Sequence, residues 1–187
     1  MTGYSKIGKR ALRDRQPCSL AGGSAERNNM SHLQVMLWFC VGAYGIHVLE
    51  EFVFDWKNWA RQVLHLPVVS EDFYLTNCLV IVVGIVAVWV APEYPAIATS
   101  LPALMLINGI LMHIFPFLLK RGRFSPGLIT AVLLFLPLGV NTIRVGHLDT
   151  RGVLTSFIVG ALLLATPIGF LLLKTMGYFD QTRSYET

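Results

Sequence analysis

LQVMLWFCVGAYGIHVLEEFVF, residues 33–54, is a continuous apolar run that carries a histidine and two glutamates near its end. A helix rises about 1.5 Å per residue, so this run is long enough to cross about 30 Å of bilayer hydrocarbon. Ionisable side chains are costly at that depth. The stretch therefore predicts a transmembrane helix in which His47, Glu50 and Glu51 have a specific task.

The whole chain shares this apolar character. Its 187 residues are 54% hydrophobic and 14% charged, with a mean hydropathy of +0.58, which is too apolar for an ordinary soluble domain. The ten-residue alternation of an outer-membrane barrel is absent, so helices are expected. We predict an all-α membrane protein, a bundle of about five transmembrane helices. Their windows are approximately 33–54, 73–91, 98–119, 126–147 and 152–174.

Two further segments differ from these windows. Residues 1–29 form a basic, polar stretch that we predict to be a disordered tail, which could lie upstream of a true start at Met30. Residues 30–187 then form a single five-span membrane domain. Residues 56–67, WKNWARQVLHLP, predict one short interfacial helix, because Trp and basic residues anchor at the headgroup level. The Lys/Arg balance leaves the orientation open when the tail is included.

Composition also excludes several functions. Cys18, Cys40 and Cys78 show no paired spacing, which argues against a disulfide framework or a zinc knuckle. The net charge of +4 is spread over the tail and short loops, as is typical of membrane proteins, so we expect no nucleic acid partner. The expected partners are the lipid bilayer and a lipid-like small molecule, and the oligomeric state stays open.

The polar residues of the windows are predicted to converge. On an α-helix His47, Glu50 and Glu51 fall at about 0°, 300° and 40°, which is one face. Counting depth at 1.5 Å per residue places His113 and Asn77 at the same level as His47. Asn108 lies a turn further inward and about 140° around the helix from His113. We therefore rank Asn77 above Asn108 as a supporting residue.

The spacing suggests a metal site. In helical H-x-x-E-H zinc motifs, the ligands at i and i+4 share a face and the adjacent glutamate is the general base. Here His47 and Glu51 hold the ligand positions and Glu50 the catalytic position, and His113 completes a His2Glu set with an open coordination site. The glutamate that replaces the second histidine leaves the divalent metal open among zinc, iron and manganese. A proton relay without metal, or a polar contact between helices, explains the same residues.

The residues His47-Val48-Leu49-Glu50-Glu51 spell H-x-x-E-E within a predicted first span. In this the chain resembles the HXXEE family of small bacterial multi-span membrane proteins, over roughly residues 33–174. Asn108, His113 and the stretch 124–127, Phe-Ser-Pro-Gly, are further points of similarity. The resemblance implies an integral protein of the bacterial inner membrane, and it supports the choice of site residues without naming a reaction.

Three functional hypotheses follow. The first is a metal-dependent integral membrane enzyme, hydrolase-type, that acts on a lipid-like or amphiphilic substrate with Glu50 as the proton acceptor. The second is a metal-free isomerase or cyclase of an apolar substrate that uses Glu50 and Glu51 as a paired acid and base. The third is an ion-coupled carrier or lipid-binding membrane subunit.

Overall fold

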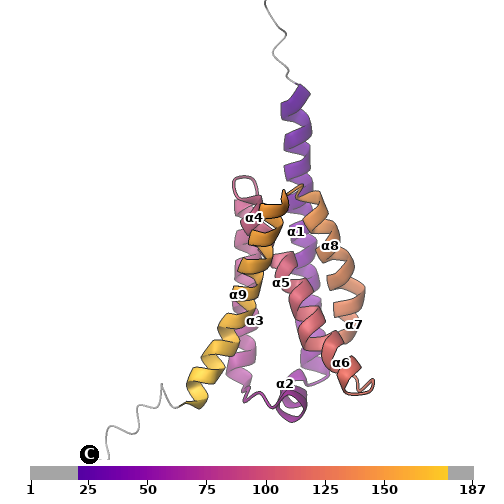
Figure 1. Cartoon of the computed structure of the whole chain (residues 1–187), viewed down its shortest axis with the longest axis vertical. Coiled ribbons are helices and arrows are strands. Elements are labelled where there is room, and N and C mark those ends of the chain that lie inside the picture. The colour runs from indigo at the N-terminus through magenta and orange to yellow at the C-terminus, as the bar shows by residue number, and fades with distance from the viewer. Residues whose placement is uncertain (1–20, 177–187) are drawn as a thin grey trace, which may run out of the picture.

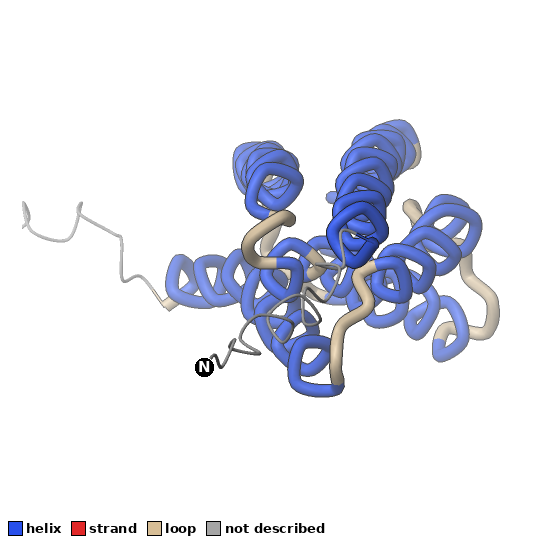
Figure 2. The backbone as a smooth tube through the Cα atoms, turned by 90° about the horizontal axis from the view of Figure 1, so that it is seen from above, coloured by secondary structure: helices blue, strands red, loops and turns tan. Residues whose placement is uncertain are grey.

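The computed structural model describes residues 21–176, and this part of the chain is helical with no strand (Figures 1 and 2). Five of its helical segments are long and apolar enough to cross a membrane. They span His32–Val53, Ser70–Val90, Pro95–Leu119, Leu128–Val145 and Thr150–Leu173. The all-α, five-span prediction is confirmed, with span limits close to the predicted windows.

Three spans are continuous helices and two are interrupted. The continuous ones are α1 (Ala21–Val53), α3 (Ser70–Val90) and α9 (Thr150–Thr175). The third span is built from α4 (Pro95–Ala98), α5 (Ser100–Asn108), η2 (Gly109–Ile114) and α6 (Phe115–Leu119), and the fourth from α7 (Leu128–Thr130), η3 (Ala131–Phe135) and α8 (Leu136–Val145). Because α1 begins at Ala21, it includes the last residues of the predicted tail, whereas residues 1–20 lie outside the described part.

The interruptions coincide with prolines. The segments η2 and η3 are π-helical turns, and each is followed within two residues by a proline, Pro116 or Pro137. Proline has no backbone N–H and its ring clashes with the carbonyl four residues earlier, so the regular α-helical bond cannot form there. A π-helical turn, with bonds from i to i+5, accommodates this break. In η2 the N–H of Phe115 bonds the carbonyl of Ile110.

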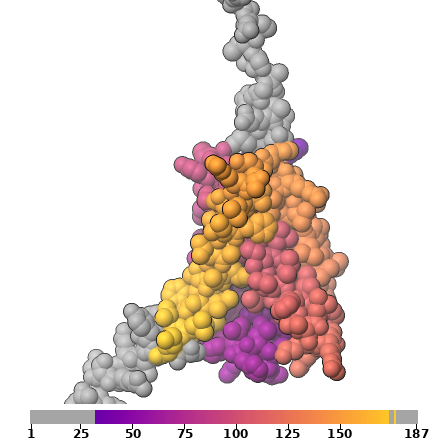
Figure 3. Space-filling view, in the orientation of Figure 1, coloured from indigo at the N-terminus to yellow at the C-terminus, as the bar shows by residue number. Residues whose placement is uncertain are grey.

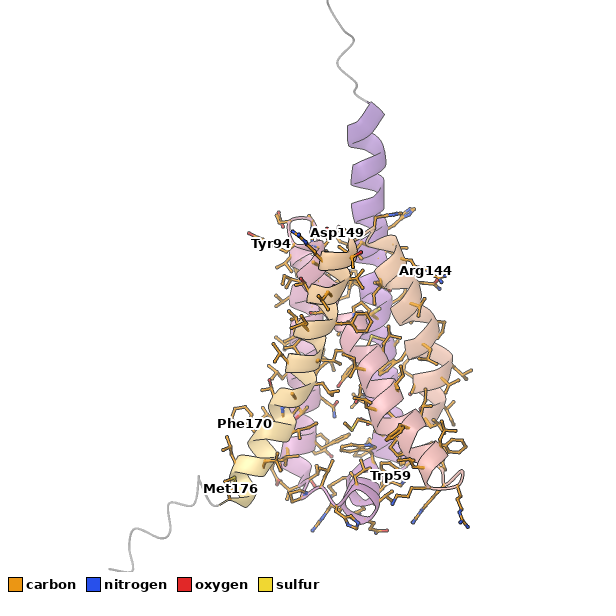
Figure 4. All side chains as sticks on the ribbon, in the orientation of Figure 1. Trp59, Tyr94, Arg144, Asp149, Phe170 and Met176 are labelled. Atoms are coloured by element: carbon orange, nitrogen blue, oxygen red, sulfur yellow. The ribbon has the colours of Figure 1, made fainter. Side chains whose placement is uncertain are left out.

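The predicted interfacial helix is present as two short segments, α2 (Trp56–Trp59) and η1 (Ala60–Leu64). They close the end of the bundle that carries Trp59, opposite the end with Tyr94 and Asp149 (Figure 4). The ring of Trp56 lies 6.1 Å from that of Phe73 on α3, centroid to centroid. The segment is therefore held against the first turn of α3.

The helix α5 lies at the centre of the packing. Its residues Leu101, Leu104 and Met105 are fully buried in a core shared with α1, α3 and η3. On its other side α5 packs against α9, where the backbones approach so closely that a Cβ at Gly160 would lie 2.8 Å from the amide nitrogen of Leu104. Beyond this contact α9 diverges from α6, toward the end that carries α2 (Figures 1 and 3).

Candidate metal centre

His47, Glu51 and His113 form one buried cluster. Both histidines are fully buried and Glu51 is 6% exposed. The Oε1 atom of Glu51 lies 3.5 Å from the Nε2 atom of His47 and 3.5 Å from the Nε2 atom of His113. The three potential ligand atoms all lie within 4.8 Å of one another. The structure thus brings α1 and the third span together at the residues expected to bind a metal.

These separations suit a small cation. Ligand atoms at about 2.0–2.2 Å from a tetrahedral ion lie about 3.4 Å from one another. The two distances of 3.5 Å from Glu51 match this value. The ring centroids of the two imidazoles are 4.8 Å apart at an interplanar angle of 84°, and the ligand atoms of the two histidines lie within 4.8 Å of each other.

A hydroxyl group orients His47. The Nδ1 atom of His47 lies 2.7 Å from the Oγ1 atom of Thr130, and this hydroxyl lies 2.6 Å from Glu50 Oε2 and 3.2 Å from the carbonyl of Gly127. Both of those oxygens only accept, so the single hydroxyl proton of Thr130 serves one of them. The hydroxyl oxygen then accepts a hydrogen bond from His47 Nδ1, which leaves the lone pair of Nε2 turned toward Glu51.

Glu50 lies outside the cluster of ligand atoms. Its carboxylate accepts hydrogen bonds from the amide groups of Gly127, Ile129 and Thr130, at 2.8–3.1 Å, in addition to the Thr130 hydroxyl. These amides are the first donors of the fourth span, which have no partner within their own helix. A carboxylate is favourable at this position because the N-terminus of a helix is partially positive. The catalytic role of Glu50 stays a prediction, and its contacts favour a positioning role.

A second hydroxyl orients His113. The Nδ1 atom of His113 lies 3.2 Å from the Oγ atom of Ser125, which in turn donates to the carbonyl of Met112 at 3.5 Å. This carbonyl precedes Pro116 by four residues, so proline has deprived it of its usual helical donor. The proline therefore frees the acceptor that orients Ser125 toward His113.

The glycine after Pro126 allows both imidazoles to approach the fourth span. Gly127 has φ of +91°, and a Cβ atom there would lie 2.6 Å from Cε1 of His113 and 2.7 Å from Cε1 of His47. No side chain fits without moving both rings. The sequence pattern assigns no role to Ser125, Gly127 or Thr130, and only the stretch 124–127 belongs to the family resemblance.

Three acceptor atoms consequently face one another. With each Nδ1 bonded to a hydroxyl, the two Nε2 atoms and the Glu51 oxygen converge in a region with almost no solvent access. The Nε2 atom of His113 is buried and has no hydrogen-bond partner. Converging acceptors repel one another unless a cation or a proton lies between them. The donor set of two imidazoles and one carboxylate is that of catalytic zinc sites.

Of the two asparagines, Asn108 contacts a member of the cluster and Asn77 contacts Tyr44. Asn108 Nδ2 lies 3.5 Å from His47 Nε2, whereas Asn77 accepts a hydrogen bond from the hydroxyl of Tyr44 at 2.9 Å. Our ranking placed Asn77 first because an α-helical period turns Asn108 away from His113. The π-helical turn between them changes this, because a π-helix takes more residues per turn than an α-helix, which reduces the angle between residues five apart. Asn108 therefore lies closer to the face of His113 than an α-helical period predicts, and its amide reaches His47.

These features define an integral membrane protein of five spans with a buried His2Glu cluster that could hold a metal ion. The family model described as "Protein of unknown function with HXXEE motif" matches residues 38–142, which is more than half of the chain. The chain belongs to this HXXEE family. No curated protein and no solved structure gives a significant match.

Proposed function

We propose that the protein is a metal-dependent integral membrane enzyme, hydrolase-type, which acts on a lipid-like or amphiphilic substrate in the bacterial inner membrane. The observation that carries the proposal is the convergence of His47 Nε2, His113 Nε2 and Glu51 Oε1 at one buried point, where the His113 nitrogen makes no hydrogen bond. Ionisable groups that are buried within membrane spans are costly, so a group of this kind usually has a function.

The ligand set supports a catalytic rather than a structural site. Three protein ligands leave a fourth position free, whereas structural zinc sites are closed by four. A bound zinc, iron or manganese ion would supply Lewis acidity toward a carbonyl or phosphoryl oxygen. In the proposed hydrolysis the oxygen of water bonds to the carbonyl carbon or phosphorus, the ester or amide bond breaks, and a proton from water passes to the leaving group.

The other residues would hold this set in place. Thr130 and Ser125 bind the far nitrogens of the two histidines, and such outer contacts fix the ring orientation of metal ligands. Glu50, on α1, binds Thr130 at the start of the fourth span and so connects these two helices. Asn108, beside His47 Nε2, is the residue best placed to donate a hydrogen bond to a substrate oxygen near the cluster.

The paired acid and base of the metal-free hypothesis receive less support. Although Glu50 and Glu51 are adjacent in sequence, the first contacts the fourth span and the second contacts the two histidines. A general acid and base acting on one substrate would need to face one space. We therefore favour the metal-dependent enzyme.

Elemental analysis tests the proposal directly. Full-length protein purified in dodecyl maltoside without chelators is expected to contain about one zinc, iron or manganese ion per chain, and this metal should be absent from His47→Ala and His113→Ala variants. His32→Ala is the matched control, because His32 is an exposed histidine of the same helix as His47. Wild-type protein without stoichiometric metal would contradict the proposal, as would variants that retain it.

A further inference from the structure

A cavity beside Glu51 gives the proposed site an apolar neighbour. It has a volume of about 100 Å³ and lies between α1, α3, the third span and α9. Glu51, Asp72, Asn77 and Asn108 contribute its polar wall, with Asp72 at the end nearest the start of α3. Leu163, Pro167 and Leu171 of α9 contribute much of the apolar wall. We call this space the chain cavity.

The chain cavity continues toward the outside of the bundle. A second cavity, of about 260 Å³, is lined by α3 and α9 alone. It shares six residues with the first, namely Asp72, Thr76, Val80, Leu163, Pro167 and Leu171. Its rim includes Leu75, 72% exposed, and Phe170, 59% exposed. Both helices lie in candidate membrane spans, so this opening faces bilayer lipid. It coincides with the part of α9 that diverges from the bundle (Figures 1 and 3).

Glu51 also borders a space of different character. A cavity of about 110 Å³ at the end of the bundle is lined by Glu51 together with Asp55, Lys57 and Ser70. Trp56 and Phe73 line both this polar cavity and the chain cavity. The indole N–H of Trp56 is buried and has no hydrogen-bond partner. Glu51 thus stands where an apolar space within the membrane meets a polar space at its edge.

We infer that the chain cavity takes one acyl chain of a membrane lipid, which enters sideways between α3 and α9 and places its polar end beside Glu51. The inference rests on the proposed function only in calling this lipid a substrate. A methylene chain gains no hydrogen bonds, so it fits a space lined by leucine, valine and proline, and the bilayer that faces the opening supplies such chains. The headgroup then lies in the polar cavity, beside Lys57 and Ser70.

This arrangement sets the class of substrate. The chain lies on the apolar side of Glu51 and the headgroup on the polar side, so the bond nearest the cluster is the one that joins them. The structure therefore favours a lipid ester or amide whose acyl carbonyl reaches the His47–Glu51–His113 cluster. A soluble polar metabolite would leave the chain cavity unfilled.

Binding of cis-parinaric acid, a fluorescent acyl-chain probe, tests the inference independently of activity. Trp56 lines the chain cavity, so bound probe should quench tryptophan emission of the full-length protein in dodecyl maltoside through energy transfer. We expect saturable transfer in the wild type. Thr76→Phe and Leu163→Phe, which fill the cavity from opposite walls, should raise the dissociation constant about tenfold, because excluding two methylene groups forfeits their burial.

Val82→Phe is the matched control. Val82 is an exposed residue of the same helix as Thr76 and lines none of these cavities, so the dissociation constant should stay within about twofold. If Thr76→Phe does not fold, as judged by its thermal transition, the dissociation constant of Leu163→Phe alone tests the inference. Transfer that never saturates would overturn the inference, and so would equal weakening by Val82→Phe and the filling variants.

The same preparations separate this inference from the proposed function. His113→Ala removes a proposed metal ligand but lines no part of the chain cavity, so it should still bind the probe. Saturable binding in protein without metal would leave the lipid site standing and remove the enzyme proposal. Stoichiometric metal without saturable probe binding would leave the enzyme proposal standing and remove the lipid site.

Discussion

At the scale of single residues, the adjacent glutamates of the HXXEE motif have separate tasks. Consecutive residues of an α-helix point about 100° apart, so Glu50 and Glu51 cannot serve one partner equally. Glu51 shares a face with His47 at i and i+4 and reaches the two imidazoles, whereas Glu50 reaches the first amides of the fourth span. Glu51 therefore belongs to the candidate metal site. Glu50 holds the start of the fourth span, which carries the hydroxyl that orients His47.

This division predicts opposite effects of two conservative substitutions. Glu51→Gln should abolish stoichiometric metal, because an amide oxygen is neutral and a poor ligand for zinc beside two imidazoles. Glu50→Gln should retain metal but lower the free energy of unfolding by about 2 kcal/mol or more, because hydrogen bonds to a charged group contribute about 1.5–3 kcal/mol. Metal content and thermal unfolding of both variants, measured on the same preparations, check the prediction.

A reversed result would assign the tasks differently. If Glu50→Gln lost metal and kept its thermal transition, Glu50 would be the ligand and Glu51 the structural residue. The contacts of the two carboxylates would then have to exchange in the metal-bound protein.

A second prediction concerns the glycine that touches both imidazoles. Gly127→Ala places a Cβ atom 2.6–2.7 Å from the two Cε1 atoms, at a φ of +91° that non-glycine residues disfavour. We expect metal content to fall by more than half and the thermal transition to drop. Gly45→Ala is the matched control, since a Cβ atom there meets nothing within 4 Å. In that variant metal content should not change, and a comparable loss would contradict the proposed contact.

At the scale of elements, hydrophobic patterning predicted the spans but not their internal geometry. Each apolar window became a helix because the bilayer leaves backbone groups no other partner. The same windows contain Pro116 and Pro137, and an α-helical period carried through them misplaced Asn108. The extra residue of a π-helical turn is a local response to proline and packing that a periodic pattern does not contain.

Sequence patterning likewise identified only some residues of the candidate site. His47, Glu51 and His113 could be chosen from sequence because ionisable residues stand out among apolar ones. Ser125 and Thr130 could not, since hydroxyl residues are common in membrane helices and become informative only once their partners are known. The role of Glu50 was likewise inaccessible, because it depends on where the fourth span begins.

A third prediction tests the π-helical turn of the third span. Pro116→Ala restores an N–H group that can bond the carbonyl of Met112, which favours an α-helical turn and removes the acceptor of Ser125. His113 should then rotate, and the metal dissociation constant should rise about 10- to 100-fold, as for the loss of other outer contacts of metal ligands. Competition with a chromogenic chelator measures this constant.

Pro137→Ala provides the comparison. Pro137 also follows a π-helical turn, but it is exposed and is not one of the residues that form the cluster or bind the two histidines. Its substitution should leave the metal dissociation constant within about twofold of wild type. Equal weakening by both substitutions would point to general loosening of the bundle rather than to the position of His113.

At the scale of the whole molecule, α9 forms one wall of the two cavities that lead from Glu51 to the outside of the bundle. Its first half packs tightly against α5, and its second half diverges and borders the cavities beside Glu51 (Figure 1). Sequence alone did not indicate this, because α9 is apolar on every side and carries no charged residue between Arg151 and Lys174. An apolar helix can face lipid or protein equally well, so its tilt is set by packing.

The close approach at Gly160 provides the last prediction. A Cβ atom at Gly160 would lie 2.8 Å from the amide nitrogen of Leu104 and 2.9 Å from the carbonyl oxygen of Ser100, and backbone atoms of a buried helix cannot yield easily. Gly160→Ala should therefore push α9 away from α5 and lower the free energy of unfolding by about 2 kcal/mol, a decrease of roughly 4–8 °C in Tm.

Gly169→Ala makes the same change in the diverging half of the helix, where a Cβ atom meets nothing within 4 Å. Alanine loses less conformational entropy than glycine in a helix, so this variant should be as stable as wild type or more stable by up to about 1 kcal/mol. Differential scanning fluorimetry of the two variants in one detergent compares them directly. If Gly169→Ala destabilised the protein as much as Gly160→Ala, the second half of α9 would have to lie against the bundle, and the sideways opening beside Glu51 would be closed.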